Sequence, residues 1–164
     1  MLMNTKNEIP LADYRALAEF RYQIRRFHHF SEQMARTAGL EPQQHQLLLA
    51  IKGLPLGKQA TIGELAERLQ IQHHSAVELV SRMVDRGFVA RQRDEKDQRR
   101  VIVHLTTKGE EILLKLSSIA LAELRSTGPD LVHALNMLAR DKENNLSDEN
   151  TSEHTAIHKL EDIF

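Results

Sequence analysis

One stretch of the chain, residues 61–109, determines the predicted fold and reads TIGELAERLQIQHHSAVELVSRMVDRGFVARQRDEKDQRRVIVHLTTKG. Thr61 and Glu64 form a capping-box pattern, which marks the start of a short helix. The helical pattern breaks near Ile71 and resumes from about His73. Two short helices around a tight turn are a helix-turn-helix candidate. The apolar residues that we expect to point inward from the second helix are Val77, Val80, Met83 and Val84.

A charged hairpin and a long helix follow. Residues 88–93 and 100–105 have the composition and alternation of strands, and residues 94–99 form the predicted hairpin between them. A second capping box, Thr107 to Glu110, opens a helix to about Ser126. We expect Gly128 and Pro129 to break it, and a last amphipathic helix with Leu131, Leu135 and Leu138 to follow. This order of elements is that of a winged helix-turn-helix.

The N-terminal part is predicted to be a long helix over Leu11–Thr37 and a second helix from Pro42 to near Gly53. The long helix carries five of the seven aromatic residues, spread around its circumference, which favours burial against a partner subunit. Packing on its own chain alone is the alternative. The fold class is therefore mostly α with a small β-hairpin wing, a winged helix-turn-helix joined to a helical dimerisation region.

The chain divides into four predicted regions: N-terminal helices (1–53), a winged DNA-binding lobe (54–106), C-terminal dimerisation helices (107–141) and an acidic, mostly disordered tail (142–164).

Composition narrows the classes of protein. The 164 residues include no cysteine, which excludes disulfides, thiolate zinc sites and thiol redox switches within these residues. No run approaches 18 apolar residues, and the first ten residues lack the apolar stretch of a signal peptide, so we expect no membrane contact and a cytoplasmic location. Net charge is −1, but residues 86–100 hold six basic and three acidic side chains. Such a basic island is typical of a phosphate-binding surface, or of a solvated hairpin.

Four segments in this order resemble the MarR family of bacterial regulators: LAERL at 65–69, VSRMVDRGFV at 80–89, the wing sequence RDEKDQR at 93–99, and LTTKG at 105–109. The resemblance extends over roughly residues 13–140, although Gln70 stands in the turn where the family often has glycine. It implies a homodimer whose first and last helices interlock and whose two lobes bind a pseudo-palindromic site in double-stranded DNA. It also implies a small, aromatic ligand between the two regions, toward which Arg15 and Arg26 could supply positive charge.

Short polar side chains at the start of a recognition helix meet base edges in the major groove, and a basic residue further along suits a phosphate. Ser75 with Glu78 could instead be a capping box of the helix, and the two histidines a solvated helix start. The predicted DNA-binding residues of this helix are Gln72, His73, His74, Ser75, Glu78 and Arg82.

In the wing, Arg99 is predicted to enter the minor groove, where arginine suits the narrow, negative surface. Asp97 is predicted to orient Arg93 or Arg99, and the alternative is a surface ion pair of little energetic consequence. The predicted DNA-binding residues of the wing are Arg93, Lys96, Asp97, Arg99 and Arg100.

Other classes fit less well. His154 and His158 are spaced as two metal ligands on one helix face, but no firm third ligand accompanies them, so no metal and no cofactor is predicted. No phosphate loop, nucleophile elbow or zinc-protease motif indicates an enzyme. The sequence thus predicts a sequence-specific DNA-binding transcription regulator, a repressor relieved by a small ligand. The alternative is a winged-helix module for protein contacts without DNA binding.

Overall fold

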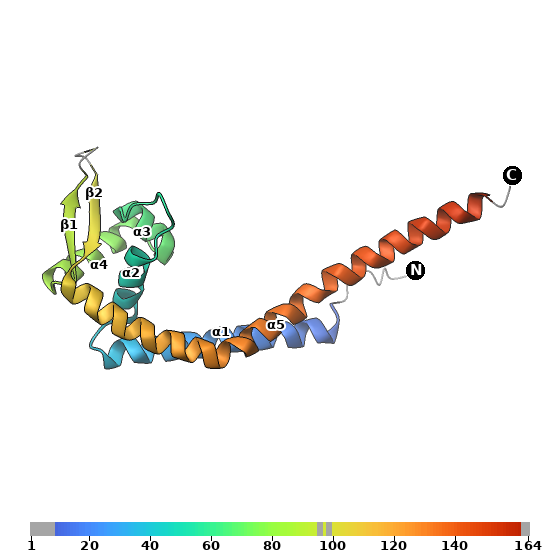
Figure 1. Ribbon diagram of the computed structural model, residues 1–164, viewed down its shortest axis with the longest axis horizontal. Helices are drawn as coiled ribbons and strands as arrows, with labels where there is room; N and C mark the ends of the chain where they lie inside the picture. Colours follow the sequence, from blue (N-terminus) through green and yellow to red (C-terminus); the bar gives the residue numbers. More distant parts are fainter. Residues whose placement is uncertain (1–8, 95–96, 98–99, 162–164) are drawn as a thin grey trace, which may run out of the picture. The chain divides into compact units, whose positions relative to one another are not determined.

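The computed structural model describes residues 9–94, 97 and 100–161, with side chains described as far as residue 139. The chain divides into two compact units, residues 28–123 and a helical unit from residues 1–27 and 124–164. The first unit is called the lobe below. The elements, drawn in Figure 1, are α1 (Leu11–Thr37), α2 (Pro42–Lys52), α3 (Ile62–Leu69), α4 (His73–Asp85), β1 (Val89–Arg93), β2 (Val101–Leu105) and α5 (Thr107–Glu161).

The helix-turn-helix of the lobe is α3 and α4, as predicted. The Thr61 hydroxyl caps α3 by accepting a hydrogen bond from the Glu64 backbone N–H at 3.3 Å. The turn between the helices places Gln70 in the left-handed region, with φ 53°. A residue with a Cβ pays a steric cost there, and the Gln70 side-chain amide offsets it by donating to the Glu67 carbonyl at 2.6 Å. The turn therefore forms without glycine.

The wing is an antiparallel pair in which Val89 lies opposite Leu105 and Arg93 lies opposite Val101. The loop before α3 adds a short third edge, because the Val103 N–H donates to the Ala60 carbonyl at 2.9 Å and Thr61 bridges Ile102. The sequence analysis predicted no strand in this segment.

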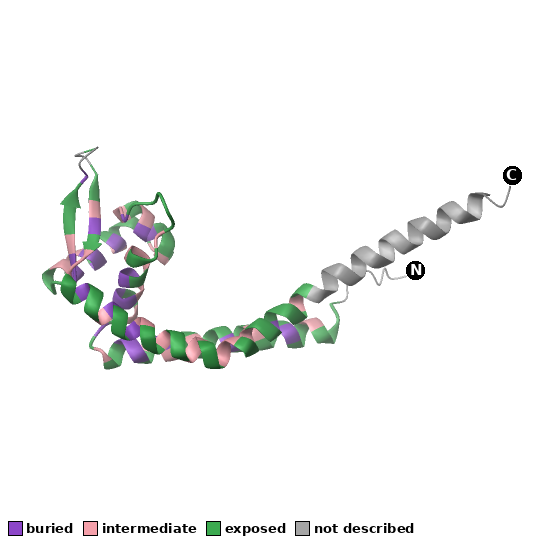
Figure 2. Cartoon of the chain, in the orientation of Figure 1, coloured by how far each residue is buried: buried purple, intermediate pink, exposed green. Residues whose placement is uncertain are grey.

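The core of the lobe is formed where α2, α3, α4 and the wing meet, and Figure 2 shows the buried positions on these elements. Helix α4 buries Ala76, Leu79, Val80 and Met83. The predicted inward position of Val77 is wrong: its side chain is 38% exposed. Because α4 begins at His73, the buried stripe runs through 76, 79, 80 and 83, and Val77 falls on its flank.

A close backbone contact joins the wing to α5. A Cβ on Gly109 would lie 2.1 Å from the Phe88 carbonyl oxygen, so only glycine fits this position. The Thr106 hydroxyl donates to the Gly87 carbonyl at 2.7 Å, and the Lys108 ammonium lies 4.4 Å from the centroid of the Phe88 ring. The sequence LTTKG at this junction therefore serves backbone packing.

Helix α5 differs from the prediction. It continues through Gly128 and Pro129 without a break, and its helical backbone runs to Glu161, where the sequence predicted mostly disordered chain. A single proline removes one backbone hydrogen bond and does not have to end a helix. No further proline or glycine follows it in α5, so the helix resumes.

The helical unit contains the first part of α1, whose bounds match the prediction, and the second part of α5. It buries Ala16, Gln23 and Ala134. Its large exposed apolar side chains include Leu11, Tyr14, Leu17, Tyr22, Ile24, Val132, Leu135 and Met137. Among the described residues, no helix combines the length and apolar character needed to cross a membrane.

Candidate nucleic-acid interface

The side of α4 that faces away from the core is polar and exposed. His73, His74, Glu78 and Arg82 are all exposed on it, and Gln72 occupies the N-cap position. Ser75 is half-buried at the third position of the helix, so it cannot be an N-cap, and the capping-box interpretation of Ser75 with Glu78 is wrong. Polar side chains at the N-terminal end of an exposed helix can reach base edges in a major groove.

Three residues that the sequence did not predict for this site connect the exposed face of α4 to the wing: Val77, Ser81 and Arg91. The Arg91 guanidinium on β1 donates to the Ser81 hydroxyl at 2.7 Å and to the Val77 carbonyl at 3.4 Å. The Ser81 hydroxyl in turn donates to the Val77 carbonyl at 2.8 Å. The first wing strand is thereby tied to the middle of α4. An arginine on a strand and a serine on a helix give no local sequence signal for such a contact.

The loop end of the wing, just beyond the two strands, contains an ion pair that was not predicted. Asp94 is 6% exposed, and its carboxylate lies 3.9 Å from the Arg100 guanidinium. The Asp94 N–H donates to the Arg100 carbonyl at 3.0 Å, and the Arg100 N–H donates to the Asp97 carbonyl at 2.9 Å. Arg93, Asp97 and Arg100 are exposed. Lys96 and Arg99, two of the predicted wing contacts, lie outside the described residues.

Not every arginine of the basic stretch faces outward for binding. The Arg86 guanidinium donates to the Gln44 side-chain oxygen at 2.6 Å and to the Gly39 carbonyl at 2.8 Å. It also lies 5.0 Å from the centroid of the Phe88 ring. Arg86 therefore links α2, α4 and the wing, and its donors are engaged within the lobe.

Comparison with known proteins agrees with this geometry. A family model described as the MarR family matches residues 38–100, which run from just after α1 to the start of β2. This segment of the lobe is therefore similar to the MarR family. A Thauera aromatica protein with a proposed role as transcriptional regulator of the hcr operon is 25% identical over 103 residues, which are 63% of this chain and 60% of the relative. The match thus spans less than two thirds of that relative.

Solved MarR-family structures share the fold of the chain. A mutant of S. aureus MepR bound to an oligodeoxyribonucleotide is 19% identical with a TM-score of 0.56, and the match covers 92% of this chain and 99% of MepR. Bordetella bronchiseptica BpsR, whose DNA binding is regulated by 6-hydroxynicotinic acid, is 20% identical with a TM-score of 0.56 over 75% of this chain and 94% of BpsR. The chain therefore has the fold of MarR-family transcription regulators.

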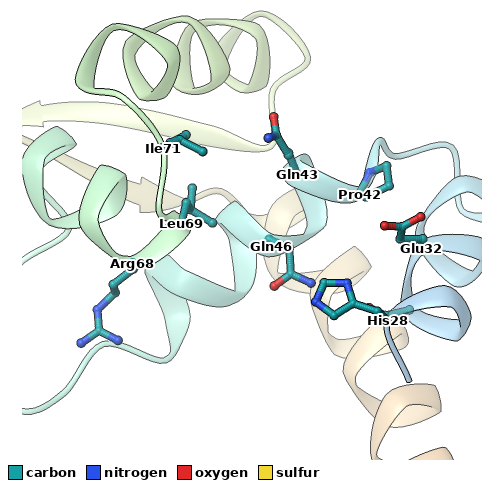
Figure 3. A pocket seen from close by; sticks show the side chains of 9 residues that line it. His28, Glu32, Pro42, Gln43, Gln46, Arg68, Leu69 and Ile71 are labelled. Carbon is teal, nitrogen blue, oxygen red and sulfur yellow. The ribbon is translucent and has the colours of Figure 1, made fainter. Parts of the chain in front are cut away.

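The lobe also contains a pocket of about 320 Å³ beside the helix-turn-helix. Leu69 and Ile71, next to the turn into α4, give it an apolar wall. In Figure 3 the His28 ring and the Gln46 amide point toward one another, while the Arg68 side chain extends away from them. The lining residues are His28, Ser31, Glu32, Pro42, Gln43, Gln46, Arg68, Leu69 and Ile71. Arg15 and Arg26, which the sequence offered as charges for a ligand, are not among them.

A charge cluster engages Arg68. Its guanidinium donates to the Glu64 carboxylate at 3.1 Å, and the Lys58 ammonium donates to the same carboxylate at 2.9 Å. The hydrogen bond from Lys58 is the largest cause that lowers the pKa of Glu64, and it raises the pKa of Lys58 in return. Arg68 is therefore paired with Glu64 at the edge of the pocket.

Among the described residues, no group of three or more histidine, aspartate or glutamate side chains is arranged to hold a metal ion. The side chains of His154 and His158, the pair that the sequence singled out, lie outside the described residues.

Proposed function

We propose that this protein is a sequence-specific, double-stranded DNA-binding transcription regulator that acts as a homodimer on a pseudo-palindromic site. The observation that carries the proposal is the exposed polar face of α4, backed by the core of the lobe. A rigid helix that buries one side and presents histidines, a glutamate and an arginine on the other is suited to a major groove. MepR, which has the same fold, was solved with an oligodeoxyribonucleotide.

Selection of bound sites from random DNA with the purified protein tests this proposal. We expect an inverted repeat, bound with an affinity that falls steeply with salt because phosphate contacts release counterions. Arg82→Ala should weaken binding to all sequences alike and reduce the salt slope by about 1. The matched control, Lys115→Ala, removes an exposed positive charge from α5 and should leave binding unchanged. No enriched DNA, or binding without salt dependence, would instead favour a module for protein contacts.

The base-reading role of the helix start has its own test. His74→Ala should relax preference at one or two operator positions, at a cost of about 1–3 kcal/mol for a lost base contact. His29→Ala, which changes an exposed histidine on α1, is the matched control. A His74→Ala variant that keeps the wild-type preference would leave the histidines as a solvated helix start.

The wing is proposed to place Arg99 in the minor groove with Asp97 as an orienting acid. Arg99→Ala should then weaken operator binding strongly while circular dichroism stays unchanged. Asp97→Ala should also weaken binding, although removal of a negative charge beside DNA would strengthen it by simple electrostatics. Tighter binding by the Asp97→Ala variant would therefore contradict the orienting role.

Dimerisation is proposed through the helical unit. Among its described residues, this unit buries few side chains and exposes large apolar residues on both of its helices. An apolar surface of that kind marks an interaction site. Sedimentation at micromolar concentration should give twice the chain mass of 18.8 kDa. A monomer that binds the inverted repeat tightly would contradict this proposal.

Repression is proposed to be relieved by a small aromatic ligand in the pocket beside α3. The apolar wall of Leu69 and Ile71 suits a ring, and His28 with Gln46 offers polar partners at its rim. A ligand against these residues would press on the turn that leads into α4. BpsR, of the same fold, has DNA binding regulated by 6-hydroxynicotinic acid.

A screen of aromatic carboxylic acids tests the ligand. Binding should raise the melting temperature and loosen DNA binding about 5- to 150-fold. His28→Ala should abolish both effects, whereas His29→Ala, its exposed neighbour outside the pocket lining, should not. Acids that change neither quantity, or that act equally on both variants, would contradict a ligand in this pocket.

A further inference from the structure

Val77 is an apolar side chain in an otherwise polar, exposed face of α4. Its neighbours one turn away on the helix surface are His73, His74 and Ser81, which are three or four residues from it. The buried apolar residues of α4 form a stripe that faces the core, and Val77 lies on the flank of that stripe. A β-branched residue is a weaker helix former than alanine, so the exposed position does not favour valine for the sake of the helix.

The backbone that carries Val77 is bound both from within α4 and from the wing. The Val77 carbonyl accepts hydrogen bonds from the Ser81 hydroxyl and the Arg91 guanidinium, at 2.8 and 3.4 Å. Arg91 belongs to β1, so Val77 lies on the side of the recognition helix that faces the wing. A side chain on a helix turn held by a neighbouring strand is preorganised for a defined contact.

The major groove offers one apolar feature to such a side chain, the C5-methyl group of thymine. We propose that Val77 is a specificity-determining residue that packs on the methyl group of one thymine in each half-site. The inference rests on the proposed DNA-binding function and deepens it. Because His74 is a neighbour of Val77 on the helix surface, the thymine should lie next to the base that His74 contacts.

Uracil replaces thymine without its methyl group and tests the inference directly. Sites are first selected from random DNA with the full-length protein, and each half-site thymine is then changed to uracil in turn. One position in each half-site should lose about fourfold in affinity for the wild-type protein, as expected for a methyl group no longer removed from water. Val77→Ala should bind the thymine and uracil forms equally, while Val77→Ile should keep the preference for thymine.

The outcomes separate the two proposals. If no DNA is enriched, the proposed function fails and this inference fails with it. If the protein binds an inverted repeat but every thymine-to-uracil change is silent, the function stands and the role of Val77 is overturned. The role is overturned equally if Val77→Ala retains the wild-type sensitivity to the methyl group. Circular dichroism of both variants confirms that α4 is intact.

Discussion

The lobe and the helical unit solve the problem of apolar burial in opposite ways. All but two of the buried apolar residues in the described chain lie in the lobe, and the exceptions, Ala16 and Ala134, are small. Many of the described large apolar side chains of the helical unit are exposed, Leu17 and Leu135 among them. A lobe with its own core is stable by itself, whereas helices with exposed apolar faces need another surface. The difference separates the part of the chain that has a core of its own from the part that is proposed to form the dimer.

Charging the helical unit should produce the largest effect. The double change Leu17→Asp with Leu135→Asp places carboxylates on its exposed apolar surface, where burial at a dimer interface would be costly. We expect monomers in sedimentation, and a loss of operator affinity of about 10²- to 10⁴-fold because two linked half-site contacts become independent.

The control for that experiment is Leu56→Asp, which adds a carboxylate at an exposed loop position of the lobe. It should leave the dimer and the operator affinity unchanged. Circular dichroism should show that the lobe remains folded in all variants. If the double variant is still dimeric, the exposed apolar surface of the helical unit does not form the dimer interface.

Truncation of a leucine in each unit comes next in size. Leu48→Ala empties a fully buried site in the lobe and should lower the free energy of unfolding by about 2–5 kcal/mol. Leu135→Ala removes an exposed side chain and should leave lobe unfolding within about 0.5 kcal/mol of wild type. Chemical denaturation at several protein concentrations measures the free energy of unfolding of both variants. Equal losses in the two variants would contradict the difference between the lobe and the helical unit.

A buried histidine in the core of the lobe provides a further test of the difference between the lobe and the helical unit. His45 on α2 is buried, and its Nδ1 atom has no hydrogen-bond partner among the described residues. Burial lowers the pKa of His45 below the usual 6.5, since the charged ring would lose its hydration.

Stability should therefore depend on pH through His45. Because the pKa of His45 is lower in the folded state, the unfolded chain takes up the proton first as pH falls. The stability that depends on a neutral His45 is therefore fully present above pH 6.5, and it is lost as pH falls through the folded-state pKa. The His45→Leu variant should lose less stability than wild type between pH 7 and pH 5 in denaturant titrations. Identical slopes for the two proteins would show that His45 does not contribute.

The smallest effect is expected where the wing meets the recognition helix. Arg91→Ala removes the hydrogen bonds to Ser81 and to the Val77 carbonyl, each worth about 0.5–1.5 kcal/mol in a protein. Ser81→Ala should weaken operator binding by a similar free energy. The double variant should weaken it by less than the sum of the two single changes, because both changes remove the same contact. Operator affinities of the three variants give the coupling, and additive losses would contradict it.

Local signals in the sequence predicted most of the elements. Capping patterns and apolar spacing located α1, the helix-turn-helix and the two strands. They failed at Pro129, because the loss of one backbone bond is a bias that a long helix can override. The short edge at Ala60 was also missed, since its pairing with β2 joins residues far apart in the chain.

The candidate site was predictable only in part. The polar start of α4 followed from helix position: His73 and His74 are exposed, whereas Ser75 is half-buried. Val77 was assigned to the core because spacing alone does not fix the phase of a short helix. The links from Arg91 to Ser81 and from Asp94 to Arg100 depend on how the wing folds back, so no single segment predicts them.

The contact of Gly109 with the Phe88 carbonyl has a mechanical consequence. The contact leaves no space between the end of the helix-turn-helix and the first turn of α5. Thr106 and Lys108 hold the same junction together by hydrogen bonds. Neither element can slide past the other without breaking backbone contacts. If the first turn of α5 moves, α4 should therefore move with it. A change that alters DNA binding would then pass through this junction without being absorbed by local bending.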